Sequence, residues 1–478
     1  MCFLLFATFI QKVLLSPIVI IKCRILNRQL QRPLHSNLTI TTPHHDYLMF
    51  SALLLSNILL FQAATSKADN ATGSMRSVSW YAGWHSADFP LSQVSWSKYT
   101  QLTYAFATTT PDVRTLSLQD SDSELLPQFV QMAHQNNVTA SISIGGWGGS
   151  QYFSTNVGSA ANRTAFVKTV AGLATQYDLD GLDFDWEYPN RQGIGCNTIN
   201  NNDTSNFLSF LQELRQDSTG SKLVLSAATS LLPWNDTSGA PSKDVFEFSK
   251  VLDFIAIMNY DVYNILSPHA GPNSPLDDTC APTNDQTGSA VSSVKAWTDA
   301  GMPTDQILLG VAAYGHSFVV PESTALQSSS SINVTNVYPS FNKSAEHLGD
   351  KWDSPGGVDV CGNFSGPSGV YSYWGLVEAG YVNKDGTPTS GVAYLFDNCS
   401  QTPFVYNKSN QTWVSYDNVQ SFALKGEFIK NNGLGGFAMW EAAGDLNDTL
   451  LDSIQSAIST SSAKSSPVSL AITVGSFL

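Results

Sequence analysis

The chain has few charged residues, and the acidic ones outnumber the basic ones. Only 13% of its 478 residues are charged, and 39 Asp and Glu against 24 Lys and Arg give a formal net charge of −15. Proteins that bind nucleic acid or an anionic membrane surface use basic patches that displace counterions. We therefore expect no nucleic-acid partner, while a neutral polymer stays compatible with this composition.

Cysteine is also scarce, with six residues in the whole chain. None of them forms a Cys-x-x-Cys motif or a His/Cys cluster typical of zinc sites, so we predict no metal and no cofactor. An even number remains beyond residue 68, and it permits three disulfide pairings among Cys196, Cys280, Cys361 and Cys399.

The first 68 residues have the character of a targeting leader. A second start-like apolar stretch begins at Met49 and reaches small residues at 63–66, which is typical of a signal-peptidase region. We predict that Met49 is the true initiator, that the signal peptide spans about 49–66, and that the protein is secreted to the extracellular space or cell wall. The alternative is that the first apolar run, residues 1–21, is a signal anchor.

Asn-x-Ser/Thr sequons support secretion, because their density beyond the leader is typical of an N-glycosylated protein. They lie at Asn70, Asn137, Asn162, Asn202, Asn235, Asn333, Asn342, Asn363, Asn398, Asn407, Asn410 and Asn447. The Ser-rich end, 459–478, finishes in a short apolar stretch that is a weak lipid-anchor signal, and a disordered tail is the preferred interpretation. We expect a monomer whose folded domain spans 69–458.

Short apolar runs alternate with amphipathic stretches between these ends. Near-continuous apolar strands in repeated strand-helix units are typical of a parallel sheet, and eight of them predict an α/β fold, the closed (β/α)8 TIM barrel. The segment 317–416 is too long for one connection and predicts a small α+β insertion between strand 7 and helix 7. The predicted strands are 78–84, 102–108, 139–146, 181–187, 222–228, 254–260, 307–314 and 435–440.

Three acidic residues in the fourth predicted strand are separated by bulky apolar ones. Because strand side chains alternate between faces, Asp183, Asp185 and Glu187 would line one surface. Repulsion among neighbouring carboxylates raises their pKa values, which can keep one of them protonated as a proton donor. A metal site, a solvated edge strand and an acid–base site are the three interpretations, and the apolar spacing disfavours a calcium loop.

Residues suited to sugar binding follow other predicted strands. Chemistry in such barrels sits at the C-terminal strand ends, and aromatic faces beside a row of acids can stack on sugar rings. Burial for purely structural reasons is the alternative for any one of these side chains. The predicted substrate-binding residues are Tyr81, Trp84, Trp147, Tyr188, Met258, Asp261, Tyr314, His316 and Trp440.

Segment 180–189 resembles the active-site strand of glycoside hydrolase family 18, the retaining chitinases, which carry Asp, two residues, Asp, one residue, Asp, one residue and Glu. The resemblance to this family extends over about residues 78–447. Ser143–Trp147 resembles the third-strand motif, Met258–Asp261 the sixth, Tyr314–His316 the seventh, Val414–Asn418 the segment that closes the insertion, and Gly435–Trp440 the eighth strand.

The resemblance implies a chitinase that cleaves chitin or chitooligosaccharides between N-acetylglucosamine units, with the substrate's own acetamido group as the nucleophile. It implies Glu187 as acid and base, Asp185 as the partner of the acetamido N–H, and Asp183 as a residue that holds or shares the proton of Asp185. Tyr260 would contact the acetamido oxygen and Trp440 would form the floor beneath that sugar.

Three positions depart from the family pattern. His316 stands where many relatives have Arg, Asn418 replaces an expected Asp, and Glu441 follows the stacking Trp where a smaller residue is more usual. Two other functions stay open: an endo-β-N-acetylglucosaminidase that acts on N-linked glycans, and a catalytically weak chitin-binding lectin.

Overall fold

The computed structural model describes residues 75–119, 122–326, 336–345 and 347–459. All of them belong to the second of two compact units, Ser74–Leu478. The predicted leader with its Met49 start, the sequons Asn70 and Asn333, and the tail beyond Ser459 lie outside the described residues. No helix within the described ranges is long and apolar enough to cross a membrane.

Eight parallel strands close into a barrel, which confirms the predicted (β/α)8 fold. Each strand pairs with the next around the ring, and closure comes from pairing of β1 with both β2 and β16. The barrel strands are β1 (Arg76–Ala82), β2 (Gln101–Thr109), β4 (Thr139–Gly145), β5 (Gly181–Asp185), β6 (Val224–Thr229), β7 (Phe254–Ile257), β8 (Ile307–Ala312) and β16 (Gly436–Trp440).

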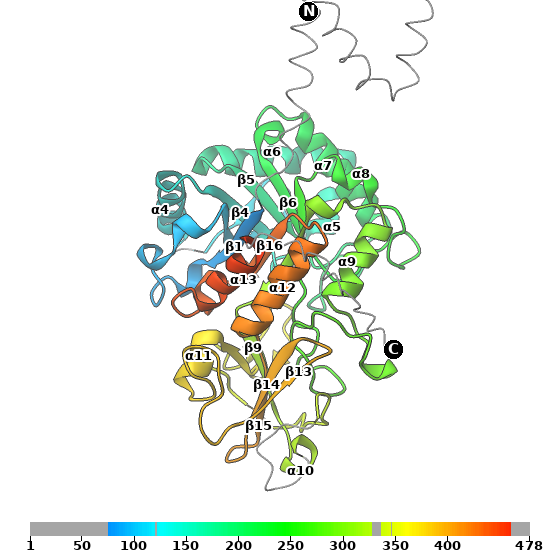
Figure 1. Ribbon diagram of the computed structural model, residues 1–478. Coiled ribbons are helices and arrows are strands. Elements are labelled where there is room, and N and C mark those ends of the chain that lie inside the picture. Colours follow the sequence, from blue (N-terminus) through cyan, green and yellow to red (C-terminus); the bar gives the residue numbers. More distant parts are fainter. Residues whose placement is uncertain (1–74, 120–121, 327–335, 346, 460–478) are drawn as a thin grey trace, which may run out of the picture. The chain divides into compact units, whose positions relative to one another are not determined.

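Helices cover the outside of the barrel, as Figure 1 shows for α6 and α7 beside β5 and β6. Ser159 caps the start of α6 through its side chain, and Asp178 ends that helix in the left-handed conformation. The larger helices are α4 (Asp122–Gln135), α6 (Ala160–Tyr177), α7 (Asp203–Gln216), α9 (Ala290–Asp299), α12 (Val419–Asn431) and α13 (Thr449–Ser459). Shorter ones are α5 (Phe153–Val157), α8 (Phe246–Ser249), α10 (Glu322–Ala325) and α11 (Tyr373–Glu378).

A second, antiparallel sheet is built between β8 and α12, where the insertion was predicted. Its strand order is β12-β9-β15-β14-β13, with β9 (Tyr314–Val319), β12 (Val370–Ser372), β13 (Ala393–Asp397), β14 (Thr402–Asn407) and β15 (Thr412–Ser415). Two short pieces, β10 (Gly357–Val358) and β11 (Phe364–Ser365), form a separate hairpin, and β3 (Leu116–Ser117) adds an antiparallel pair to β2.

The seventh barrel strand is shorter than predicted. Strand β8 ends at Ala312, and Tyr314 already begins β9 of the second sheet. The apolar run that predicted one strand over 307–314 therefore contains the end of one strand and the start of another. Tyr314 and His316 consequently belong to the insertion sheet rather than to the barrel wall.

Candidate active site

The acidic row lies on β5 and the two residues that follow it. Asp183, Asp185 and Glu187 are 2%, 5% and 9% exposed. Leu182, Phe184 and Trp186 point the other way and belong to the core between the barrel and its helices. The predicted alternation is observed, and the burial of all three acids excludes the solvated edge strand.

Asp183 sits at the bottom of this row in a shell of donors. Ser226 Oγ donates to its Oδ1 at 2.7 Å, and Ser143 Oγ and Trp80 Nε1 donate to its Oδ2 at 2.8 and 3.2 Å. Burial raises the pKa of Asp183, while these three hydrogen bonds lower it. The strands β1, β4 and β6 thereby hold one carboxyl rigidly beneath its neighbours.

The cost of burying Asp185 is offset by fewer hydrogen bonds than that of burying Asp183. Its Oδ1 is buried and has no hydrogen-bond partner. Burial raises the pKa of Asp185 well above its ordinary value, and the charges of Glu187 and Asp183 raise it further. An unpaired buried oxygen of this kind is available to a hydrogen-bond donor that enters from outside.

Burial raises the pKa of Glu187 to about 7, and the charge of Asp261 adds to this effect. A hydrogen bond from Tyr188 and the charge of Arg191 act in the opposite direction. A carboxyl that titrates near 7 can be both a proton donor and a proton acceptor at neutral pH.

The backbone of Glu187 is anchored on both sides. Its N–H donates to Ser150 Oγ at 3.0 Å, and its carbonyl accepts from Asn197 Nδ2 at 2.7 Å. Ser150 Oγ also lies 2.9 Å from the carbonyl oxygen of Asp185. Ser150 and Asn197 were not predicted to belong to the site, because each reaches Glu187 from a loop that no local pattern connects to the acidic row.

Tyr260 and Asp261 follow β7 and face the acidic row. Burial raises the pKa of Tyr260 well above its ordinary value, and the charges of Asp185, Asp261 and Glu187 add to this, so its hydroxyl stays protonated. Asp261 Oδ1 accepts a hydrogen bond from Tyr314 OH at 2.7 Å. The same oxygen lies 2.7 Å from His316 Nε2. The structure thus brings Tyr260, Asp261, Tyr314 and His316 together beside Glu187.

Asn273 holds this group and was not predicted. Its Oδ1 accepts from the backbone N–H of Asp261 at 2.9 Å, and its Nδ2 donates to the Tyr314 carbonyl at 3.0 Å. The backbone N–H of Asn273 donates to Ser415 Oγ on β15. This fully buried amide therefore connects the loop after β7 to the second sheet.

Aromatic side chains cluster above the barrel interior. Trp440 lies 5.8 Å from Trp80 and 5.7 Å from Phe106 between ring centroids, and Met258 packs in the same cluster. Trp84 lies 6.4 Å from Trp440 and is 44% exposed. Trp147 follows β4 and is also half-exposed.

One predicted residue differs from this arrangement. Tyr81 is not in the site: it is buried in the outer core, stacks on Phe129, and donates its hydroxyl proton to the Phe89 carbonyl. Alternation along β1 explains the error, because Trp80 occupies the inward position. Tyr188, in contrast, is half-buried beside the acidic row, where it hydrogen-bonds Glu187, and the Arg191 guanidinium lies 3.9 Å from the centre of its ring.

Asn418 and Glu441, which also depart from the family pattern, have structural roles. Asn418 caps α12, where its side chain accepts from the Ser421 N–H. Glu441 is buried, lies 3.2 Å from His85 Nδ1, and accepts from the N–H groups of Ala82 and Ala443. The His85 ring in turn stacks on Trp352 of the insertion, with a centroid distance of 3.9 Å.

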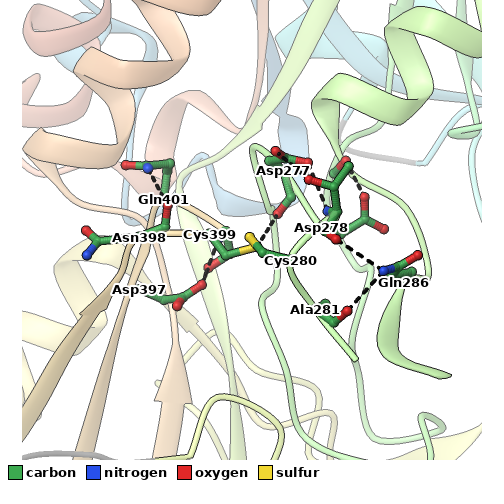
Figure 2. The surroundings of a disulfide bond; sticks show 12 residues. Asp277, Asp278, Cys280, Ala281, Gln286, Asp397, Asn398, Cys399 and Gln401 are labelled. Carbon is green, nitrogen blue, oxygen red and sulfur yellow. Dashed lines mark hydrogen bonds between the residues drawn. A yellow bond between two sulfur atoms is a disulfide. The ribbon is translucent and has the colours of Figure 1, made fainter. Parts of the chain in front are cut away.

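Two disulfides join the insertion to barrel loops. Cys196, after β5, pairs with Cys361 in the turn of the β10–β11 hairpin. Cys280, after β7, pairs with Cys399 between β13 and β14. Figure 2 shows this second bridge between the segment of Asp277 and Asp278 and that of Asp397 and Asn398.

Among the residues that the structure describes, no group of three or more His, Cys, Asp or Glu side chains could hold a metal ion. The Asp183 carboxyl instead accepts from hydroxyl and indole donors. The arrangement offers a proton donor that titrates near neutral pH, an unpaired carboxyl oxygen, a tyrosine hydroxyl and an aromatic floor. Such a set suits acid–base cleavage of a neutral sugar polymer.

Comparison with known proteins supports this interpretation. The family model described as "Glycosyl hydrolases family 18" matches residues 76–445. A protein of Moniliophthora roreri named "chitinase-like effector" is 50% identical over 403 residues, which cover 84% of this chain and 98% of that protein. A Moniliophthora perniciosa protein of the same name is 49% identical over 391 residues, covering 81% and 88%. The crystal structure of a Rhizomucor miehei chitinase aligns with a TM-score of 0.71 and 33% identity, covering 80% of this chain and 100% of that one.

Proposed function

Because the chain belongs to glycoside hydrolase family 18, we propose that it is a chitinase that hydrolyses β-1,4 bonds between N-acetylglucosamine units of chitin and chitooligosaccharides. The observation that carries this proposal is Glu187, a buried carboxyl with a pKa of about 7, in one row with Asp185 and Asp183. Tyr260, the fourth residue expected to take part in the chemistry, lies close enough to this row for the charges of Asp185, Glu187 and Asp183 to raise its pKa.

In the proposed reaction, Glu187 donates its proton to the glycosidic oxygen, and the bond from that oxygen to the anomeric carbon breaks. Family 18 enzymes are exceptions to the two-carboxylate rule because the substrate assists. The acetamido oxygen attacks the anomeric carbon and forms an oxazolinium ion. Water then adds to that carbon as Glu187 takes back a proton, so the anomeric configuration is retained.

In this proposal the neighbours of Glu187 have separate roles. The unpaired Oδ1 of Asp185 accepts the acetamido N–H and stabilises the positive charge of the intermediate. Asp183, fixed by its three donors, holds the lower end of the row in place. Tyr260, which stays protonated, donates to the acetamido oxygen, and Trp440 supports the sugar ring.

The substrate class has support from solved structures with the same fold. A Cycas revoluta chitinase was solved in complex with (GlcNAc)3 and a Nicotiana class V chitinase variant with NAG4, both 22% identical to this chain. Their ligands are neutral, in agreement with the net charge of −15. We further propose secretion and N-glycosylation, since the paired cysteines suit an oxidising compartment.

A second candidate is a chitin-binding protein with weak or no catalysis. The name "chitinase-like effector" of the two Moniliophthora relatives favours it. The intact acidic row favours the enzyme, because a protein that only binds has no use for a proton donor with a raised pKa.

Replacing Glu187 by Gln tests the proposal. We expect loss of at least about a thousandfold in hydrolysis of chitin pentamers and hexamers, because the proton donor is gone while the shape is kept. Oligosaccharide binding, measured by calorimetry, should persist. Chromatography should show freshly formed β-anomers from the parent protein.

The exposed Glu427 on α12 is the matched control, and Glu427→Gln should cleave at the parental rate. Tight binding without cleavage by the parent protein would establish the second candidate. Release of N-linked glycans from a glycoprotein, with no action on chitin oligosaccharides, would instead make the protein an endo-β-N-acetylglucosaminidase.

A further inference from the structure

A hollow of about 900 Å³ lies at the N-terminal end of the barrel strands, away from the acidic row. It is lined by Thr139 and Val224, the first residues of β4 and β6, and by Asp180, which directly precedes β5. A hollow of this volume is within the range of small-molecule sites. The acidic row lies at the opposite, C-terminal strand ends, so the proposed reaction makes no use of this hollow.

The hollow has an apolar floor and a polar rim. Val138, Leu179 and Leu223 line it and are each less than one-tenth exposed. Asp178 and Lys222 also line it, and both are exposed. A sugar ring offers an apolar face together with hydroxyls that donate and accept hydrogen bonds, so it can use both kinds of surface. This lining therefore suits a neutral carbohydrate.

The charges at the rim make a phosphate or another anion a poor occupant. The side chain of Asp178 is 94% exposed. Asp180 Oδ2 accepts from the Ala140 N–H at 2.9 Å and lies 3.0 Å from His134 Nε2, while its side chain remains 43% exposed. The two carboxylates are accompanied by one lysine, Lys222, so the net charge of these three groups is negative and repels an anion.

A glycosylation sequon opens directly onto the hollow. Asn137, Val138 and Thr139 form the Asn-x-Thr pattern, and all three line it. Asn137 is exposed and adopts the left-handed backbone conformation, with φ 56°, just beyond the end of α4. Its N–H donates to the His134 carbonyl, and the Val138 N–H donates to the Ala133 carbonyl. Such a helix end fixes the point from which the Asn137 side chain projects.

The fold does not use the amide nitrogen of Asn137. Among the residues that the structure describes, none forms a hydrogen bond with this side chain. Other sequons differ in this respect. Asn162 Nδ2 donates to the Thr155 carbonyl at 2.8 Å. Asn235 Nδ2 donates to the Asn190 carbonyl at 3.2 Å. A sugar attached to Asn137 would therefore cost the fold no hydrogen bond.

We propose that Asn137 carries an N-linked glycan and that its first two sugars, both N-acetylglucosamine, lie in this hollow. In the attachment, Nδ2 loses a proton and bonds to the anomeric carbon of a lipid-pyrophosphate-linked oligosaccharide, while the bond from that carbon to the pyrophosphate oxygen breaks and the lipid pyrophosphate leaves. Because the acceptor lines the hollow, the attached sugars are held there at a high effective concentration. This inference rests on the proposed N-glycosylation and not on the hydrolysis of chitin.

Deglycosylation of the native protein tests where the glycan lies. The full chain is secreted from a eukaryotic host and digested for timed intervals with a peptide N-glycosidase, and mass spectrometry measures the glycan that remains at Asn137 and Asn447. We expect release at Asn137 to be at least about tenfold slower, because the sugars must first leave the hollow. In denatured protein the two sites should be released at equal rates.

Asn447 is the matched acceptor. It is also exposed and left-handed, with φ 53°, but it does not line the hollow. Within the described part of the chain, its side chain forms no hydrogen bond either. The two sites therefore differ mainly in the surface beside them.

A further variant separates the hollow from the acceptor. Thr175 lies on α6, is exposed and lines the hollow, so Thr175→Trp fills it without changing the sequon. We expect release at Asn137 to become as fast as release at Asn447 in this variant. An unchanged rate at Asn447 shows that the variant is folded. Gln176→Trp is the control, because Gln176 is the exposed next residue of the helix and does not line the hollow, and Asn137 should stay protected in it.

An empty Asn137 in secreted protein whose other sequons are occupied would overturn the assignment of this site. Equal release at Asn137 and Asn447 in the native protein would overturn the placement in the hollow, as would slow release that persists in Thr175→Trp. If no sequon is occupied, the proposed N-glycosylation itself fails and this inference fails with it. Cleavage of chitin hexamers by the same protein decides the chitinase function separately.

Discussion

Burial of the Glu187 carboxyl affects the stability of the protein as well as its chemistry. The side chain is less than one-tenth exposed, and its nearest polar neighbours do not offset the lost hydration. Its pKa therefore differs between the folded and unfolded chain, which makes the free energy of unfolding dependent on pH.

We expect Glu187→Gln to stabilise the folded protein at high pH. Below pH 4.5, the ordinary value, the carboxyl is protonated in both states, and Gln changes little. Between 4.5 and about 7 the unfolded chain loses this proton while the folded chain keeps it, so the parent protein loses stability as pH rises. Denaturant unfolding should show a gain for the variant that grows across this window to on the order of 2–3 kcal/mol and then levels off. A gain independent of pH would contradict the assignment.

Period-two alternation made the acidic row predictable, because it depends on neighbours in the sequence. The same rule could not say which of Trp80 and Tyr81 faces inward, since both are large aromatics in one strand. Asn273 and Ser150 were beyond prediction, because their partners Tyr314 and Glu187 are distant in the sequence and meet them only in the folded chain.

At the scale of elements, the β10–β11 hairpin depends on a covalent bond. Its two strands have two residues each and pair only with one another. A two-stranded hairpin is marginal in water, and the Cys196–Cys361 disulfide fastens its turn to the loop after β5. The pairing itself was left open by the sequence, because four cysteines allow three arrangements.

Replacing Cys196 and Cys361 together by Ser should release this hairpin. We expect amide hydrogen exchange at 357–365 to become at least tenfold faster, with the barrel strands unchanged, because little else holds the hairpin in place. The double replacement of Cys280 and Cys399 is the control and should instead affect the segments around 280 and 399. Unchanged exchange at 357–365 would show that side-chain packing is sufficient.

The strands of the barrel were predictable at this scale, since each is a short apolar run bounded by turn residues. All eight appear, with boundaries that differ by a few residues. The end of the seventh strand was wrong because the chain leaves the barrel and enters the second sheet within one continuous apolar segment.

At the scale of the whole molecule, a buried ion pair joins the barrel to the second sheet. Lys425 Nζ, on α12, donates to Asp417 Oδ1 at 2.6 Å and to Ser274 Oγ at 2.7 Å. Both charged side chains are at most 1% exposed. Burial lowers the pKa of Lys425, while the charge of Asp417 opposes this shift.

We expect Lys425→Met to lower the free energy of unfolding by roughly 3–5 kcal/mol, because it leaves Asp417 buried without a partner. Adding Asp417→Leu should recover most of this loss, since an apolar pair of similar volume needs no compensation. The exposed Lys295–Asp299 pair is the control, and Lys295→Met should have little effect. Urea unfolding would exclude the predicted coupling if the two replacements lowered the free energy of unfolding additively in the double variant.

The insertion touches the barrel at three separated loops, through His85 and Trp352, Cys196 and Cys361, and Cys280 and Cys399. These anchors follow β1, β5 and β7, so they are spread around the barrel mouth rather than gathered at one hinge. Under the proposed function, we expect an insertion fixed in this way to be in place before a sugar chain arrives. The residence time of a bound chain would then be governed by the breaking of its own contacts, not by the opening of a gate.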